Sequence, residues 1–216
     1  MRSDRSLQPI CARAPTSVGV RRVLIAPCDT VGASTRLSNV RLFVAVWPSE
    51  AVRSTLTGAV APSASPRVRW VPAQNWHVTL VFLGTVADEQ LTDLVDVLEG
   101  VVASSEPRVA RLGPATALLG KRVLYIPVRG LDELATEIRR VVAPFGESED
   151  REQPFVGHLT LARAGRRHSV PAALSGASLS SEWPVREVSL VSSTTRPEGA
   201  HYDSLFSFRL GGPGSP

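Results

Sequence analysis

The same four-residue pattern occurs twice in this 216-residue chain, and each copy lies in an apolar stretch. His77-Val78-Thr79-Leu80 is followed 81 residues later by His158-Leu159-Thr160-Leu161, so the two copies use half of the chain's four histidines. Because side chains alternate between the two faces of a β-strand, each copy places its histidine and threonine on one face and its aliphatic residues on the other. The pattern therefore predicts two strands that each present an imidazole and a hydroxyl.

The segments around these two strands predict one domain of the α+β class over residues 39–212. Strand-like apolar runs occur, besides that at His158, at 41–47, 68–71, 76–83, 115–119, 122–128, 185–191 and 202–210. Helices are expected at 50–60 and, from apolar stripes at helical spacing, along 91–102 and 131–145. Residues 164–182 are expected to form an irregular surface connection. Because pairs of strands alternate with helices, we expect antiparallel sheets and an internal pseudo-repeat.

The first 38 residues differ from the rest in composition. They contain six arginines, two aspartates and no glutamate, and they show little periodicity apart from the short apolar patch Val23–Ala26, which could form a strand. We expect residues 1–38 to be a basic, disordered extension without a catalytic role. A transit peptide and a start site assigned too far upstream are alternative interpretations. At the other end, residues 213–216 are expected to fray.

Charge and cysteine usage narrow the chemistry of the domain. The net charge of +4 equals that of residues 1–38, so the remainder, with 18 basic and 18 acidic residues, is formally neutral and gives weak support to a broad nucleic-acid groove. Both cysteines, Cys11 and Cys28, precede residue 39, which excludes thiolate metal sites, disulfides and cysteine nucleophiles in the domain. No apolar run approaches the roughly 18 residues of a membrane helix. A cytoplasmic setting fits the absence of cysteine.

Two histidines on facing strands predict acid–base catalysis. Histidine titrates near neutral pH, so one imidazole can remove a proton while another, protonated, donates one. Such a pair suits an in-line displacement at phosphorus, with His77 and His158 on opposite sides of the reacting atom. The hydroxyls of Thr79 and Thr160 can donate hydrogen bonds to non-bridging phosphate oxygens. No acidic cluster accompanies either histidine, so neither a metal nor another cofactor is predicted.

Other residues near the two patterns are weaker candidates. Arg163 could bind phosphate through its paired N–H donors, but its strand parity is opposite to that of His158 and Thr160. It reaches the site only if the strand ends or twists there. We expect His168 and His201 to be solvated. Aromatic rings could stack on a base, but core packing is the expected role of Trp76, Phe82 and Phe155.

The residues around both patterns resemble the 2H phosphoesterase superfamily, which is named for two His-x-Thr/Ser motifs. More closely, they look like the bacterial and archaeal RNA 2′,3′-cyclic phosphodiesterases, also called 2′-5′ RNA ligases. The resemblance covers about 41–210 and is carried by Arg41–Val46, Val68–Pro72, Asn75–Gly84, Pro154–Arg163 and Gly199–Asp203. It implies a bilobal α+β fold in which two antiparallel sheets flank a central cleft, with helices on the outside and a pseudo-twofold axis.

The resemblance also implies a reaction, the hydrolysis of an RNA or nucleoside 2′,3′-cyclic phosphate to a 2′-phosphate. Carried over from the family, His77 is the general acid and His158 the general base, with phosphate bound by Thr79 and Thr160. The residues themselves do not order the two histidine roles. Two positions depart from the family pattern, because relatives often have Pro at the position of Gly157 and a polar or basic residue at that of Val81.

Two other functions are open at this stage. The same site could join RNA ends reversibly through a 2′-5′ linkage, or the chain could be a nucleotide- or RNA-binding module without turnover. The expected partner is an RNA with a 2′,3′-cyclic phosphate end or a cyclic nucleotide, and the sequence does not indicate its length. It does not indicate an oligomeric state either.

Overall fold

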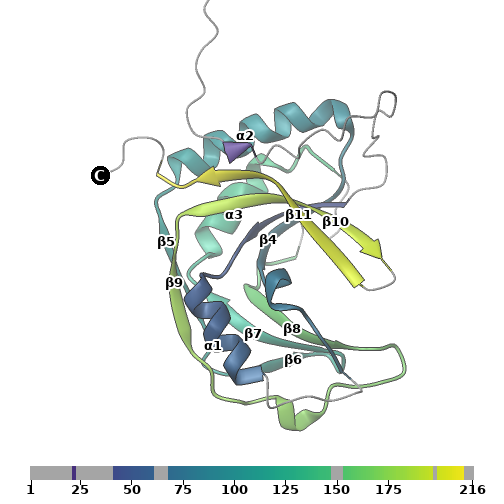
Figure 1. Ribbon diagram of the computed structural model, residues 1–216. Coiled ribbons are helices and arrows are strands. Elements are labelled where there is room, and N and C mark those ends of the chain that lie inside the picture. The colour runs from purple at the N-terminus through teal and green to yellow at the C-terminus, as the bar shows by residue number, and fades with distance from the viewer. Residues whose placement is uncertain (1–20, 23–40, 61–67, 147–152, 197–198, 212–216) are drawn as a thin grey trace, which may run out of the picture.

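The computed structural model describes residues 21–22, 41–60, 68–146, 153–196 and 199–211 (Figure 1). Of the N-terminal extension, it describes only strand β1 (Arg21–Arg22), which pairs with strand β11 (Gly199–Arg209). The disorder predicted for the rest of the extension, the strand suggested at 23–26 and the frayed end at 213–216 lie outside the described residues.

All strand pairs among the described residues are antiparallel, and they connect into one strongly curled sheet (Figure 1). The other strands are β2 (Arg41–Val46), β3 (Val68–Trp70), β4 (Val78–Thr85), β5 (Arg108–Leu112), β6 (Ala117–Leu119), β7 (Val123–Arg129), β8 (His158–Ala164), β9 (Ser181–Val185) and β10 (Glu187–Arg196). The α-helices are α1 (Glu50–Val60), α2 (Leu91–Ser104) and α3 (Asp132–Val141). Short 3-10 helices are η2 (Ala73–Asn75), η3 (Asp88–Gln90) and η5 (Ala172–Leu174).

The sheet consists of two similar halves that meet at the histidine strands. The strand order is β1-β11-β10-β2-β4-β8-β7-β5-β9, with β3 added to β8 and β6 to β7. β4 and β8 pair at a single position, Val78 with Leu159. Beyond β4 the path continues through β2, β10, β11 and β1, and beyond β8 it continues through β7, β5 and β9. The order β2-α1-β4 recurs as β7-α3-β8. The predicted α+β fold with two antiparallel halves and a pseudo-twofold relation is confirmed, and the β4–β8 contact joins the halves into one hydrogen-bonded path.

The helices cover the sheet and tie the two halves together. α3 packs against β4 although it follows β7, and α1 packs near β9 although it follows β2, so each crosses to the other half. α2 lies beside α3 and β11 (Figure 1). The predicted apolar stripes are buried, and removing their apolar surface from water stabilises the fold. The buried residues are Leu94, Leu98 and Val102 on α2 and Leu134, Ala135 and Ile138 on α3. None of the described helices is both long and apolar enough to cross a membrane.

Three details of the expected strand pattern are wrong. β5 has no counterpart among the predicted strands, because Arg108 and Arg111 interrupt the apolar run. Residues 181–182, expected in an irregular connection, belong to β9, and the strand expected at 185–191 divides between β9 and β10. β9 contains Pro184 but alternates polar residues with the buried Trp183 and Val185. It lies at the edge of the sheet, where a missing N–H is tolerated.

Candidate active site

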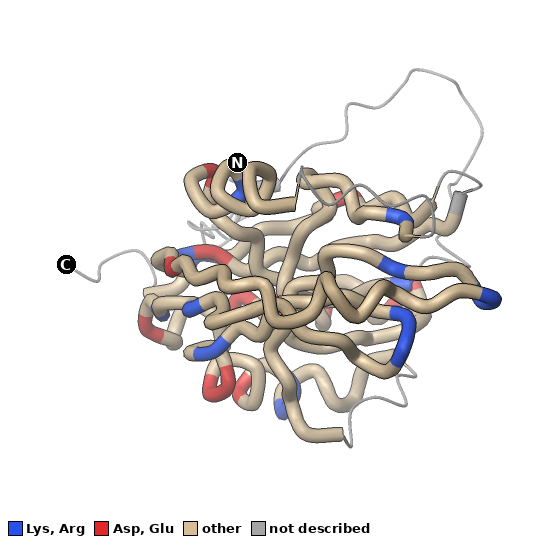
Figure 2. The backbone as a smooth tube through the Cα atoms, turned by 90° about the horizontal axis from the view of Figure 1, so that it is seen from below, with Lys and Arg blue, Asp and Glu red and all other residues tan. Residues whose placement is uncertain are grey.

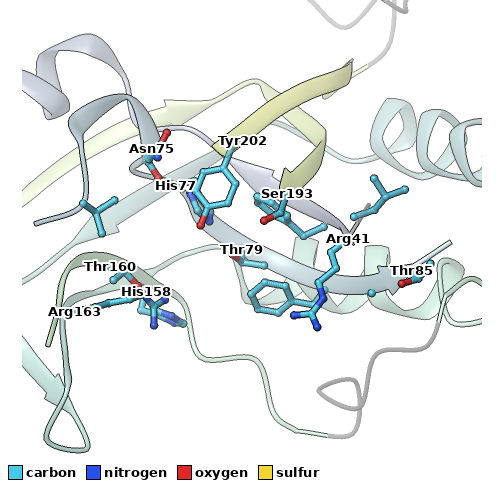
Figure 3. Close-up of a pocket in the computed structure, with 15 residues that line it drawn as sticks. Arg41, Asn75, His77, Thr79, Thr85, His158, Thr160, Arg163, Ser193 and Tyr202 are labelled. Atoms are coloured by element: carbon cyan, nitrogen blue, oxygen red, sulfur yellow. Dashed lines mark hydrogen bonds between the residues drawn. The ribbon is translucent and has the colours of Figure 1, made fainter. Parts of the chain in front are cut away.

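Both His-x-Thr patterns lie where β4 and β8 meet, and their alternation places the polar residues on one side. The aliphatic residues point into the core and are at most 2% exposed, as predicted for Val78, Leu80, Leu159 and Leu161. On the opposite face, one cavity of about 480 Å³ is lined by the partly exposed His77, Thr79, His158 and Thr160 (Figure 3). The fold therefore brings together two motifs that lie 81 residues apart in the chain.

Each imidazole is held by a hydrogen bond to the backbone carbonyl oxygen two residues before its histidine. Nδ1 of His77 donates to the carbonyl oxygen of Asn75 at 2.7 Å, and Nδ1 of His158 donates to that of Val156 at 2.8 Å. Because a carbonyl oxygen only accepts, each Nδ1 carries the hydrogen. Each Nε2 is therefore the ring nitrogen left for a ligand, as an acceptor in neutral histidine and as a donor in the protonated form.

His77 is the more enclosed of the two histidines. Its ring centroid lies 5.0 Å from those of Phe43 and Tyr202 and 5.6 Å from that of Trp47. Burial lowers the pKa of His77 from 6.5 to about 4, because a charged imidazolium loses its hydration there. The hydrogen bond to the Asn75 carbonyl oxygen acts in the opposite direction. In the ligand-free site, His77 is therefore neutral at pH 7.

Positive charge on the facing half reinforces this effect. His158 and Arg163 both lower the pKa of His77 further, although less than burial does. Among the described residues, the aromatic neighbour of His158 is Tyr125, whose ring centroid lies 5.7 Å away. The two histidines thus make equivalent hydrogen bonds to the backbone, but His77 is surrounded by more aromatic rings than His158.

Arg163 also lines the cavity, because β8 contains a β-bulge. Thr160 and Ala162 lie opposite adjacent residues of β7, so Leu161 has no residue of its own to pair with. Leu161 and Ala162 are both buried in the core, and Arg163 returns to the cleft side. In a regular strand, alternation from His158 would place Arg163 on the core face. The extra residue of the bulge moves it to the cleft face.

The same irregularity occurs at the equivalent place in β4. Thr79 and Val81 lie opposite adjacent residues of β2, so Leu80 is the extra residue and Phe82 comes to the cleft side. Phe82 is 47% exposed and lines the cavity, so the prediction that it packs in the core is wrong. Phe82 and Arg163 each follow their histidine by five residues. Equivalent positions of the two halves therefore hold an aromatic ring and a guanidinium group.

The remaining residues singled out from the sequence lie away from the cavity. Trp76 is buried and Phe155 packs against the core, as expected. His168 is exposed, also as expected. His201 is exposed as well, and its Nε2 lies 3.2 Å from a carboxylate oxygen of Asp203.

The charges around the cavity favour an anionic ligand. Arg41 and Arg163 line it, and no aspartate or glutamate of the described chain does so. Figure 2 shows basic and acidic positions interspersed on one side of the fold and mainly basic positions on the other. Within the described ranges, no three histidine, cysteine, aspartate or glutamate side chains gather as metal ligands. The groups available for chemistry here include the imidazoles of His77 and His158, the hydroxyls of Thr79 and Thr160, and the guanidinium groups of Arg41 and Arg163.

Comparison with known proteins agrees with this geometry. A family model described as "2′-5′ RNA ligase superfamily" matches residues 46–197. The chain belongs to this superfamily. It is 33% identical to the RNA 2′,3′-cyclic phosphodiesterase of Thermus thermophilus over 80% of this chain and 91% of that protein. The corresponding protein of Aquifex aeolicus is 27% identical over 80% of this chain and 98% of its own length.

Solved structures of the superfamily share the fold. The crystal structure of TT0787 from Thermus thermophilus has a TM-score of 0.70 and 30% identity, and covers 80% of this chain and 98% of that one. The crystal structure of Escherichia coli LigT complexed with 3′-AMP has a TM-score of 0.65 and 28% identity, with the same coverage.

The chain has a glycine, Gly157, immediately before the second histidine. A Cβ atom at Gly157 would clash with the carbonyl oxygen of Val128. The backbone N–H of Val128 in turn donates to the carbonyl oxygen of Gly157 at 2.8 Å. The absence of a side chain thus lets the segment before His158 lie directly on β7.

Several residues that line the cavity of this superfamily member were not predicted from the sequence. Among them, Tyr202 is in direct contact with His77. Its ring lies edge-on to that of His77, and burial raises the pKa of its hydroxyl while the charge of Arg163 acts in the opposite direction. Asn75 Nδ2 donates to the carbonyl oxygen of Ala200 at 3.1 Å, which ties η2 to β11. The resemblance at 199–203 could have indicated Tyr202. The other missed polar residues are Arg41, Thr85 and Ser193.

Proposed function

We propose that this chain hydrolyses the 2′,3′-cyclic phosphate of an RNA end or nucleotide to a 2′-phosphate, without a metal. The observation that carries the proposal is the pair of imidazoles whose Nδ1 atoms are fixed by the backbone. They face one cavity together with Thr79 and Thr160, and no acidic residue of the described chain lines it. The relatives named RNA 2′,3′-cyclic phosphodiesterases support the proposal. So does a LigT structure described as complexed with 3′-AMP. The cytoplasmic setting is part of this proposal.

In the proposed reaction, one histidine takes a proton from water as the water oxygen attacks phosphorus. The new P–O bond forms opposite the P–O3′ bond, which breaks, and the second histidine gives its proton to the departing O3′. Negative charge grows on the non-bridging oxygens, where the hydroxyls of Thr79 and Thr160 donate hydrogen bonds. Arg163 offsets the same charge from the edge of the cavity.

The family assigns the acid role to His77 and the base role to His158, and we adopt this order. Because burial lowers the pKa of His77 to about 4, His77 is neutral in the ligand-free enzyme at pH 7. It acts as an acid only after it has gained a proton. A bound cyclic phosphate brings a negative charge into the cavity, and an adjacent negative charge favours the imidazolium form. Substrate binding and protonation of His77 are therefore coupled in this mechanism.

The test of the function is turnover of adenosine 2′,3′-cyclic phosphate in excess chelator. We expect adenosine 2′-monophosphate as the product, at the same rate with and without the chelator. No turnover, a 3′-monophosphate product or inhibition by the chelator would contradict the proposal. RNA halves that end in a 2′,3′-cyclic phosphate and a 5′-hydroxyl extend the assay. A 2′-5′ joined product instead of simple hydrolysis would establish the ligation alternative.

We expect Arg163→Gln to lower kcat/KM for this substrate by about tenfold, the lower end of the range for a charge-assisted hydrogen bond, because Arg163 is solvent-exposed. Arg163→Lys should lose less, since it keeps the charge but not the paired donors. Arg129→Gln is the matched control, because Arg129 is exposed at the end of the neighbouring strand β7 and does not line the cavity. Equal rates for Arg163→Gln and the control would remove Arg163 from the phosphate site.

A further inference from the structure

The cavity is longer than the two histidines require. Figure 3 shows Arg41 and Thr85 at the end of the cavity that lies away from His158 and Arg163. Together with Ser193, they form a polar group that the proposed phosphate chemistry does not use. A cavity with a cation at each end can hold a ligand with more than one anionic group.

Strand register places Arg41, Thr85 and Ser193 in the first of three rows along β2, although the pairing with β4 shifts between successive rows. Arg41 lies opposite Thr85 of β4 on one side and Ser193 of β10 on the other. The next row toward the histidines has Phe43 opposite Phe82, and the row after that has Ala45 opposite Thr79. Alternate residues of a strand share a face, so all three β2 residues face the cleft.

Phe43 and Ala45 form a small buried cluster with Val191 of β10, apart from the main core. This separation agrees with a face of β2 that is turned toward the cleft. At about 3.3 Å per residue, the Arg41 row lies about 13 Å along β2 from the Thr79 row, with the aromatic row halfway. The arginine side chain can span part of that distance.

The guanidinium group of Arg41 is available to a ligand. Arg41 is exposed, and its side chain makes no hydrogen bond or ion pair with any residue of the described chain. In the row between Arg41 and the catalytic residues, Phe82 presents a ring that is 47% exposed, beside Phe43 at a centroid distance of 6.0 Å. An exposed ring on a cleft floor can stack on a nucleobase.

We propose that Arg41, with the hydroxyls of Thr85 and Ser193, forms a second phosphate subsite, which binds the 5′-phosphate of the nucleotide whose cyclic phosphate lies between the histidines. The proposal rests on the proposed function and specifies its substrate. Threonine hydroxyls, an aromatic ring and a guanidinium follow one another along the cleft, as cyclic phosphate, nucleoside and 5′-phosphate do along the ligand. The substrate class is therefore an RNA end or a 5′-phosphorylated nucleotide, in preference to a nucleoside 2′,3′-cyclic phosphate.

The test compares adenosine 2′,3′-cyclic phosphate with its 5′-phosphorylated form. We expect the 5′-phosphate to raise kcat/KM by about tenfold in the native chain, in line with one charge-assisted phosphate contact. In Arg41→Ala this ratio should fall to about 1, whereas Arg41→Lys should keep part of it. Arg209→Ala is the matched control, since Arg209 is exposed at the far end of β11, and it should keep the native ratio. A native ratio of 1, or an unchanged ratio in Arg41→Ala, would overturn the subsite.

A binding experiment separates the subsite from the reaction. Calorimetry with adenosine 3′,5′-bisphosphate and with 3′-AMP measures the contribution of the 5′-phosphate without any turnover. If the chain hydrolyses no cyclic phosphate but the bisphosphate binds about tenfold more tightly through Arg41, the proposed function fails and the subsite stands. Hydrolysis without any Arg41-dependent preference overturns the subsite alone. Thermal unfolding of each variant shows whether Arg41→Ala is folded, and Arg41→Lys provides the second variant if it is not.

Discussion

Replacing His77 or His158 by glutamine is expected to lower kcat/KM for a 2′,3′-cyclic phosphate by about 100-fold to 10,000-fold, the usual contribution of a positioned acid or base. Glutamine fills similar space but does not exchange protons in this pH range. For His158→Gln the loss should fall mainly on kcat, because proton transfer occurs in the transition state and not in the bound ground state. For His77→Gln KM should rise as well, because protonated His77 also pairs with the bound phosphate. Initial rates over a range of substrate concentrations separate the two parameters.

Two controls make this result specific. His168→Gln changes an exposed histidine that does not line the cavity, and it should keep the native rate. The double variant of His77 and His158 should lose much less than the product of the two single losses, since the two groups act in one displacement. His77 is packed among aromatic rings, so thermal unfolding has to show that its variant is folded. A folded variant with full activity would contradict the two-histidine mechanism.

Local sequence patterns predicted much of the fold and the centre of the site. Period-two alternation placed the histidines and threonines on one face, and apolar stripes located helices α2 and α3. Parity failed at Phe82 and Arg163, because each lies just beyond a bulge. A bulge depends on how two strands pair, and neither partner strand is adjacent in sequence to the motif it shifts. The extra residue of each bulge could therefore not be predicted from the sequence alone.

Other cavity residues were not predicted for the same kind of reason, because their position depends on strand pairing. Arg41 and Tyr202 lie near opposite ends of the domain, and only the strand order β11-β10-β2-β4 brings them to one cleft. The overall charge composition did not indicate the charge of the site either. The domain is formally neutral, yet its cavity is lined by two arginines and by no acidic residue of the described chain. The local arrangement of charge, and not the net charge, determines which ligand the site favours.

His77 is expected to bind an anion together with a proton. Burial lowers its pKa to about 4 in the free site, and a bound anion raises it, because the imidazolium is then paired with negative charge. Between these two pKa values, the free protein has neutral His77 and the complex has the protonated form. Binding then takes up a proton and weakens as the pH rises, by up to about tenfold per pH unit. Over two pH units within this window, the affinity should fall by up to about 100-fold.

Sulfate is a suitable probe, because its charge is constant above pH 4. Calorimetry in two buffers of different ionisation enthalpy measures the protons taken up, and NMR titration of the imidazoles assigns them. We expect His77→Gln to lower the number of protons taken up. If His77 titrates near its ordinary value of 6.5 in the free protein, burial does not control it. If sulfate leaves the pKa at about 4, His77 stays neutral beside the anion, and it must be the base while His158 is the acid.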